Sequence, residues 1–249
     1  MAARDLAFGE GDRVRTWGRY VARPDGEWLD LARVHDLLIK PPGWKSDRSI
    51  RLIGVDAAAV PTDWTAHQAP GSISVVGRWG DESIEVDGQS PETPRWRPRT
   101  DRSIPPCPPP PDGWRRDAEI WELGPDADDL EASGTIVHKA IFRPSENQEV
   151  LVVAATDVDA VTRQLSRHLP DQLCVVQSRF TRAQLDGVRD VLLARWQEWR
   201  LETIGTGHSD AQGQPFATAE PFRVPAAMAE WADTLPEGLL QVSPTIVPA

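Results

Sequence analysis

A belt of prolines in the middle of the chain constrains the fold more than any other feature of the sequence. Nine prolines lie between Pro91 and Pro111, and six of them fall in the run from Pro105 to Pro111. Proline fixes φ and has no backbone N–H, so this stretch can form neither a helix nor a central strand. Residues 105–111 are expected to be extended and stiff. The belt therefore predicts a Pro-rich linker over 91–113, with a docking peptide for an aromatic groove as the alternative.

Length and charge limit the classes of protein that the chain can represent. Its 249 residues, of which 40% are hydrophobic, suffice for one large domain or two ordinary ones. The formal net charge is −11. The acidic excess lies in the second half, because residues 1–100 carry 15 acidic and 14 basic side chains. A general polyanion binder is disfavoured, since such a protein needs a positive field to release phosphate counterions.

The sequence predicts neither a secretory leader nor a membrane span. Residues 1–12 contain Arg4, Asp5, Glu10 and Asp12 and have no apolar run of signal-peptide length. No stretch approaches the ~18 uninterrupted apolar residues that a membrane helix requires. We therefore expect a cytoplasmic protein with no membrane partner.

Residues 12–88 are expected to form five strands separated by turns. The dipeptide Asp25-Gly26 after Pro24 predicts a turn between the first two strands. The strand order, with a glycine inside strands one, three and four, resembles an OB-fold barrel. The resemblance implies an OB-like β-barrel domain over 1–90, in a fold whose members bind nucleic acid, oligosaccharide or protein. The expected strands are Asp12–Ala22, Glu27–Arg33, Ser49–Val55, Gly71–Trp79 and Ser83–Val86.

Residues 114–249 are expected to form an α+β sandwich domain. The motif Thr181-Arg182-Ala183-Gln184 is typical of a capping box at the start of a helix. Segregated hairpins and helices favour the α+β class over an alternating α/β fold. The expected strands are 135–142, 149–154, 173–176, 201–205, 215–221 and 240–247, and the expected helices begin near 157, 181 and 226.

The stretch VLVVAATD…LCVVQSRFTRAQLDGV, from Val150 to Val188, is similar to part of the pro-regions of bacterial α-lytic-type serine proteases. Such pro-regions fold and inhibit an attached protease. No protease domain is expected after this stretch and no signal peptide before it. The resemblance implies a βαβα shape used for protein binding.

No assembled catalytic or metal-binding motif occurs in the sequence, and we predict neither a cofactor nor a metal site. The five histidines lack the spacing of a metal-binding helix, and a P-loop and a nucleophile elbow are absent. The chain has only two cysteines, Cys107 and Cys174, which argues against a disulfide scaffold and a zinc site of four thiolates. Cys107 is expected to be exposed and Cys174 to be a buried core thiol. A hydrolase would have to use His138, His168 or His208 with acidic neighbours.

The first predicted strands gather arginine and tryptophan on one face. Because side chains alternate along a strand, Arg13, Arg15, Trp17 and Arg19 share one side of the first strand. Trp28 on the second strand and Arg51 on the third join them if the strands pair in OB order. Guanidinium and indole groups stack on bases, sugars or aromatic side chains and are enriched at protein interfaces. These six residues are the predicted ligand-binding site; the alternative is that the second domain or the proline belt covers them.

Three hypotheses about function remain. The first is an acidic, non-catalytic interaction protein that binds another protein, for instance as an inhibitor or immunity-type protein of a basic partner. The second is a reader of single-stranded nucleic acid or oligosaccharide, which the net charge disfavours. The third is a hydrolase with an unrecognised site. The sequence does not determine the oligomeric state.

Overall fold

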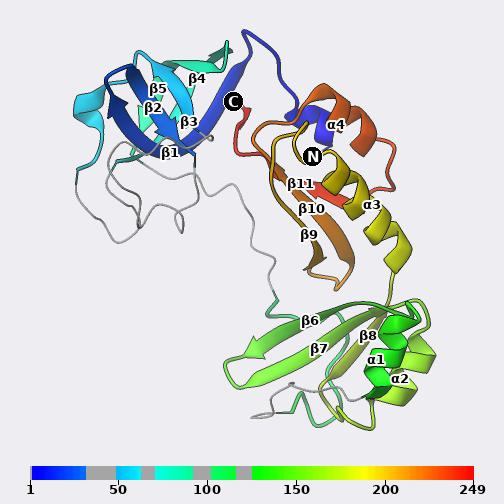
Figure 1. Cartoon of the computed structure of the whole chain (residues 1–249). Coiled ribbons are helices and arrows are strands. Elements are labelled where there is room, and N and C mark those ends of the chain that lie inside the picture. Colours follow the sequence, from blue (N-terminus) through cyan, green and yellow to red (C-terminus); the bar gives the residue numbers. More distant parts are fainter. Residues whose placement is uncertain (1, 32–48, 63–70, 92–101, 116–124) are drawn as a thin grey trace.

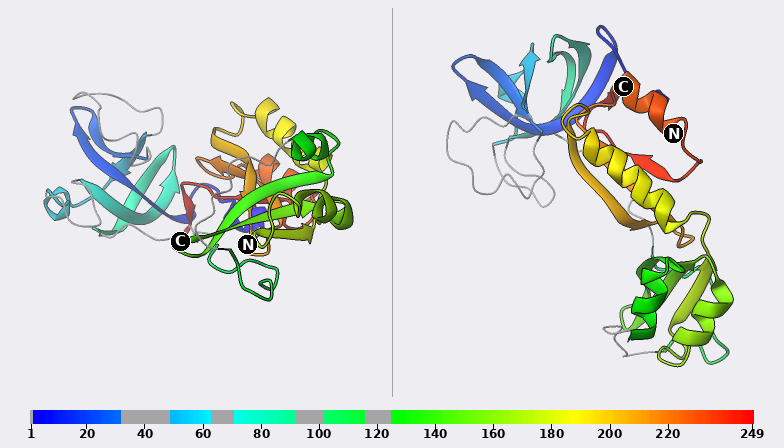
Figure 2. Two further views of the ribbon diagram at one scale, coloured as in Figure 1. Left: turned by 90° about the horizontal axis from the view of Figure 1, so that it is seen from below. Right: turned by 45° about the vertical axis from the view of Figure 1, so that its right-hand side comes forward.

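The chain has a mixed α+β fold with three separate sheets, as the computed structural model shows for residues 2–31, 49–62, 71–91, 102–115 and 125–249 (Figure 1). The predicted α+β class is confirmed. The right view of Figure 2 places the sheet that runs from β9 (Leu201–Ser209) to β11 (Leu240–Val242) between the N-terminal sheet and the sheet that runs from β6 (Ile136–Ser145) to β8 (Leu173–Gln177). Across the described ranges, no helix has the length and apolar character needed to cross a membrane.

The first sheet closes into a ring. Its strands follow the order β1-β2-β3-β5-β4, and β4 pairs again with β1. All of these pairs are antiparallel except that of β3 with β5, which is parallel. The ring is compatible with the barrel architecture expected from the sequence. Its strands are β1 (Arg13–Arg23), β2 (Gly26–Asp30), β3 (Ser49–Ile53), β4 (Ser72–Gly80) and β5 (Ser83–Ser90), and the 3-10 turn η3 spans Ala57–Ala59.

Two strand glycines allow the backbones of the ring to approach closely. A Cβ on Gly18 would lie 2.4 Å from the carbonyl oxygen of Asp30, and one on Gly77 would lie 2.1 Å from that of Glu85. Any side chain at these positions would force neighbouring strands apart. This explains why the sequence places glycine inside strands that are otherwise rich in β-formers.

Residues near each end of the chain are buried in a hydrophobic core that is formed mainly by the other part of the chain. Leu6, in the 3-10 turn η1 (Ala3–Leu6), is buried in the core of the C-terminal sheet. In the opposite direction, Phe222 and Ile246 are buried among the inward residues of the barrel. The last strand, β12 (Val247–Pro248), pairs with β1. Each of these two hydrophobic cores therefore includes side chains from the other part of the chain.

The second sheet combines a hairpin with a parallel third strand. Strand β7 pairs antiparallel with β6 and parallel with β8. Side chains of α1 and α2 pack on one face, where Leu151 and Val153 point. Because the other face is also covered, β7 is apolar along most of its length. The elements are α1 (Pro125–Ala132), β6 (Ile136–Ser145), β7 (Gln148–Ala155), α2 (Val158–Leu165) and β8 (Leu173–Gln177).

Residues 102–115 of the proline belt cover the other face of this sheet. They form neither helix nor strand, as predicted, and residues 92–101 of the predicted linker lie outside the described residues. Cys107 and Trp114 pack against Phe142 and Val152. The amide N–H of Arg143 donates to the carbonyl oxygen of Arg102 at 2.8 Å. The described part of the belt is thus packed against a sheet.

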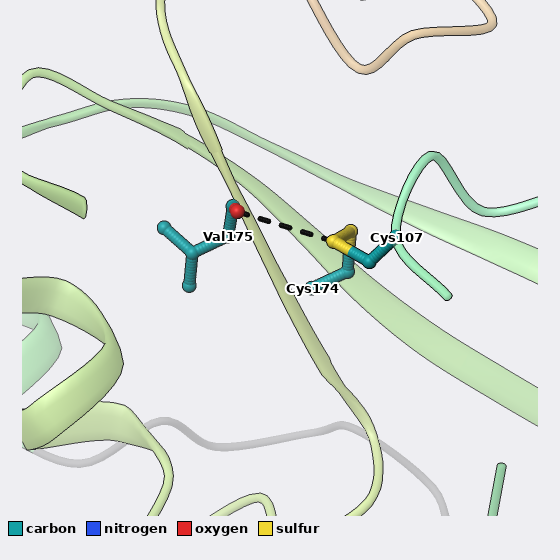
Figure 3. Close-up of a disulfide and its surroundings, with 3 residues drawn as sticks. All are labelled: Cys107, Cys174 and Val175. Atoms are coloured by element: carbon teal, nitrogen blue, oxygen red, sulfur yellow. Dashed lines mark hydrogen bonds between the residues drawn. A yellow bond between two sulfur atoms is a disulfide. The ribbon is translucent and has the colours of Figure 1, made fainter. Parts of the chain in front are cut away.

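Cys107 and Cys174 form a disulfide, so the expectation of two unpaired thiols is wrong (Figure 3). Cys107 is half-buried and Cys174 on β8 is buried. The sulfur of Cys107 lies 3.9 Å from the carbonyl oxygen of Val175. The sequence could not reveal the pairing, because the two cysteines are 67 residues apart and only the packing of the belt brings them together.

The third sheet repeats the element order of the second. Each unit runs helix, hairpin, helix, strand, and in each the last strand is parallel to the middle one. The predicted capping box is present at Thr181 and Gln184. Trp199 is buried in the core, although α3 ends before it. The elements are α3 (Arg182–Ala194), β9 (Leu201–Ser209), β10 (Pro215–Pro221), α4 (Ala226–Ala232) and β11 (Leu240–Val242).

A candidate binding face on the barrel

Strand β1 carries a row of arginines on the outer side of the ring. Arg13, Arg15 and Arg19 are exposed and Trp17 is half-buried, whereas Val14, Thr16 and Gly18 between them are buried. The alternation follows from the period of two along a strand. The first four residues of the predicted site therefore lie on one face.

The pairing of β1 with β4 places small serines opposite two residues of this row. Trp17 lies opposite Ser74, and Arg19 lies opposite Ser72. Arg13 lies opposite Arg78, which is also exposed. Directly opposed residues share a face of the sheet. Arg78 thus belongs to the same face, although the sequence analysis did not single it out.

Trp28 and Arg51 lie directly opposite each other on β2 and β3. The guanidinium of Arg23 lies over the Trp28 ring, 5.0 Å from its centroid, and its Nη2 donates to Oγ of Ser49 at 3.0 Å. The Nε1–H of Trp28 donates to Oδ1 of Asp25 at 3.2 Å. These contacts fix the indole beside the β1–β2 turn. The last two predicted site residues therefore lie next to each other, at the far end of β1 from Arg13.

We call these eight residues the arginine face: Arg13, Arg15, Trp17, Arg19, Arg23, Trp28, Arg51 and Arg78. The period of two in SISVVGRW would have placed Arg78 there from the sequence alone. Arg23 is the last residue of β1 and shares the parity of Arg19.

The same face also carries carboxylates, because the strand register places Asp30 opposite Arg19 and Glu85 opposite Arg78. Arg13 donates two hydrogen bonds to the carboxylate of Asp87, at 3.0 and 3.2 Å, and this contact raises the pKa of Arg13. Four further arginines have no ion-pair partner among the described residues: Arg15, Arg19, Arg51 and Arg78.

The second and third sheets differ in this respect. There most basic side chains are paired, for example Arg143 with Glu149 and Arg189 with Asp186. Surface ion pairs contribute little to stability, so the contrast concerns the electrostatic field rather than the fold. The arginine face therefore presents exposed arginines without ion pairs among the described residues, on a protein whose net charge is −11.

Two of the three histidines considered for a hydrolase, His138 and His208, lie close to each other. No carboxylate is a hydrogen-bond partner of either among the described residues. Within the same ranges, no three side chains of the metal-binding types form a group that could hold an ion. The carboxylates of Asp128, Asp129 and Glu131 lie on α1, and Glu131 pairs with Lys139.

Comparisons of the chain with protein-family models, with curated proteins and with solved structures find no match. The similarity of residues 150–188 to protease pro-regions therefore rests on the sequence alone. Over this stretch the element order is β7, α2, β8, α3, which is the βαβα order that the similarity implied.

Proposed function

We propose that this chain is a non-catalytic binding protein that engages another protein through the arginine face of its barrel. The observation that carries the proposal is the set of four arginines without ion pairs on one outer surface of the described residues. The planar guanidinium group of arginine pairs with a carboxylate through two parallel hydrogen bonds. The complementary surface of the partner would therefore carry acidic side chains. A partner that bound the acidic second half of this chain would instead carry basic side chains.

We infer that the barrel is OB-like. The support is the order β1-β2-β3-β5-β4 together with the parallel pairing of β3 and β5. OB-fold proteins use strands 2 and 3 and the adjoining turns to bind their ligands. Trp28 and Arg51 lie on those strands, and Arg51 lies opposite Ser83 at the start of β5. The arginine face thus includes the surface that this architecture offers to ligands.

The test is a comparison of partner capture by matched variants. The double variant Arg15→Ala, Arg51→Ala removes two unpaired guanidinium groups from the face. The control, Arg163→Ala with Arg167→Ala, removes two exposed arginines from the second sheet unit, where neither has an ion pair among the described residues. We expect the wild type and the control to retain one stoichiometric protein partner from source lysate, and the face variant to lose it. Equal capture by all three proteins would refute the proposal.

A second candidate function is binding of single-stranded nucleic acid by the same face. Its support is the indole of Trp17 placed between the guanidinium groups of Arg15 and Arg19 on β1. Such a site would bind oligonucleotides with an affinity that falls steeply as salt rises. The double variant Trp17→Ala, Arg15→Ala would abolish that binding. Weak binding to every oligonucleotide, independent of salt, would exclude this candidate in favour of the first.

The cellular compartment of the protein matters for both candidate functions. The sequence predicts a cytoplasmic protein, whereas disulfides such as Cys107–Cys174 persist mainly in oxidising compartments. In a reducing cytoplasm the two cysteines would be thiols. Alkylation of unpaired thiols in freshly lysed source cells, followed by mass spectrometry, distinguishes the two environments.

A further inference from the structure

Four basic side chains from four separate segments gather where the second and third sheets meet. They are Arg102 on the proline belt, His138 on β6, Arg182 at the start of α3 and His208 on β9. This place lies away from the barrel, so it is distinct from the arginine face. Figure 1 shows the β9–β10 hairpin reaching toward β6 at this junction.

Hydrogen bonds tie two guanidinium groups to residues that adjoin the histidines in sequence. Nη2 of Arg102 donates to Oγ of Ser209, the residue after His208, at 3.5 Å. Nη1 of Arg182 donates to the carbonyl oxygen of Val137, the residue before His138, at 3.5 Å. The two arginines therefore reach the junction from different segments.

The electrostatic field at the junction is positive. The pKa of His138 is lowered to about 4, first by burial and then by the charges of Arg102, His208, Arg182 and Lys139. Burial and Arg102 also lower the pKa of His208. Among the described residues, no carboxylate raises either value.

Two of the neighbouring cations already have acidic partners. Lys139 pairs with Glu131, and Nε of Arg182 lies 3.4 Å from Oδ2 of Asp186. Arg102 has no ion pair among the described residues, and its guanidinium donates there to the neutral hydroxyl of Ser209. Within that part of the chain, Arg102 is therefore the cation of the junction that lacks a negative partner.

His138 also has an unsatisfied polar atom. Its Nε2 is buried and has no hydrogen-bond partner among the described residues. A buried polar atom without a partner costs free energy, and native proteins rarely leave one without a reason. A neutral imidazole with its proton on Nε2 would donate to an anion. The same anion would compensate the positive field.

We propose that the junction binds an oxoanion of the phosphate or sulfate class, with Arg102 and His138 as its principal ligands and Arg182 as a further source of positive charge. Guanidinium forks and an imidazole N–H are donors that suit tetrahedral oxoanions. A bound anion would join the belt, β6 and the β9–β10 hairpin. This site goes beyond the proposed function, because it does not depend on the arginine face or on a protein partner.

The first test measures binding of inorganic phosphate to the full chain by calorimetry and thermal unfolding, with sodium chloride at equal ionic strength as the reference. We expect saturable binding and a rise in Tm that chloride does not reproduce. The variant Arg102→Gln should weaken phosphate binding about tenfold or more, the effect of losing a charge-assisted hydrogen bond. The control Arg163→Gln, an exposed arginine on α2, should bind as the wild type does. Equal effects of phosphate and chloride on the wild type would overturn the proposal.

A second measurement does not depend on the folding of a variant. Phosphate should shift the imidazole NMR resonances of His138 in the wild-type protein and raise its pKa, because an anion stabilises the protonated ring. Unchanged His138 resonances at saturating phosphate would also overturn the proposal. A phosphomonoester such as AMP, titrated in parallel, identifies the source: tighter binding than phosphate assigns the oxoanion to a larger ligand, and equal binding assigns it to the free ion. The results of these phosphate measurements do not depend on whether the arginine face captures a protein partner.

Discussion

Thr16 and Thr245 are joined by a buried hydrogen bond across almost the whole length of the chain. Oγ1 of Thr16 on β1 donates to the carbonyl oxygen of Thr245 at 3.0 Å, and both residues are buried. The next residue, Ile246, has no exposed surface and packs in the barrel core. The barrel is therefore completed by residues from the C-terminal end.

The first prediction follows from this completion. Replacing Ile246 by Ala should lower the free energy of unfolding by about 2–5 kcal/mol, because it removes buried methyl groups and leaves a cavity. Urea unfolding followed by tryptophan fluorescence measures the loss. The matched control is Ile53→Ala on β3, since Ile53 is 48% exposed and should cost far less. A loss at position 246 no larger than that at position 53 would contradict the burial of Ile246 in the barrel core.

The second prediction concerns the disulfide. It closes a loop of 67 residues, so the chain-entropy argument gives about 4 kcal/mol of stabilisation when Cys107 and Cys174 are paired. Reduction by dithiothreitol should lower the Tm of the wild type. The double variant Cys107→Ser, Cys174→Ser should start from the lower Tm and should not respond to the reductant. Free thiols in the protein before reduction would show that the pairing is wrong.

The sequence predicts the local elements well and their connections poorly. Alternation along residues 12–23 identifies β1 and its outward arginines, because the pattern depends only on the pleat of a strand. The capping box at Thr181 identifies the start of α3 for a similarly local reason.

Contacts between distant parts of the chain are not encoded in any local pattern. The pairing of Cys107 with Cys174 and the burial of Ile246 in the barrel depend on packing between segments. The same holds for the junction, where Arg102 and His138 come from segments that only the folded chain brings together. The arginine face was predictable because each of its residues lies on a strand with regular alternation.

The third prediction tests the close approach of strands in the barrel. Gly77→Ala would place a Cβ 2.1 Å from the backbone oxygen of Glu85, so β4 and β5 must move apart. We expect a loss of about 1–3 kcal/mol in the free energy of unfolding, as for other overpacked sites. Gly80→Ala on the same strand is the control, because no described atom lies within 4 Å of the position that its Cβ would take and its φ is not positive. Chemical denaturation of the two variants gives the comparison, and equal losses would contradict the explanation.

The last prediction is a pH dependence of stability that originates at His138. Its pKa is about 4 in the folded chain against an ordinary value of 6.5, so between these pH values the unfolded chain binds a proton that the folded chain does not. Stability is therefore unaffected by this group above pH 6.5 and falls as the pH drops from 6.5 toward 4. After allowance for partial solvent screening, the loss should reach about 2–3 kcal/mol.

Urea unfolding at pH 7, 6, 5 and 4, in buffers without phosphate or sulfate, measures this loss. His138→Gln removes the titrating ring, so its stability should decline less between pH 7 and 4 than that of the wild type. The carboxylates of the protein titrate equally in both chains, and the difference between the two curves isolates the imidazole. Parallel curves for the two proteins would show that His138 is solvated like an ordinary surface histidine. In the presence of saturating phosphate the wild type should lose less stability between pH 7 and 4, because the bound anion raises the pKa of His138 toward its ordinary value.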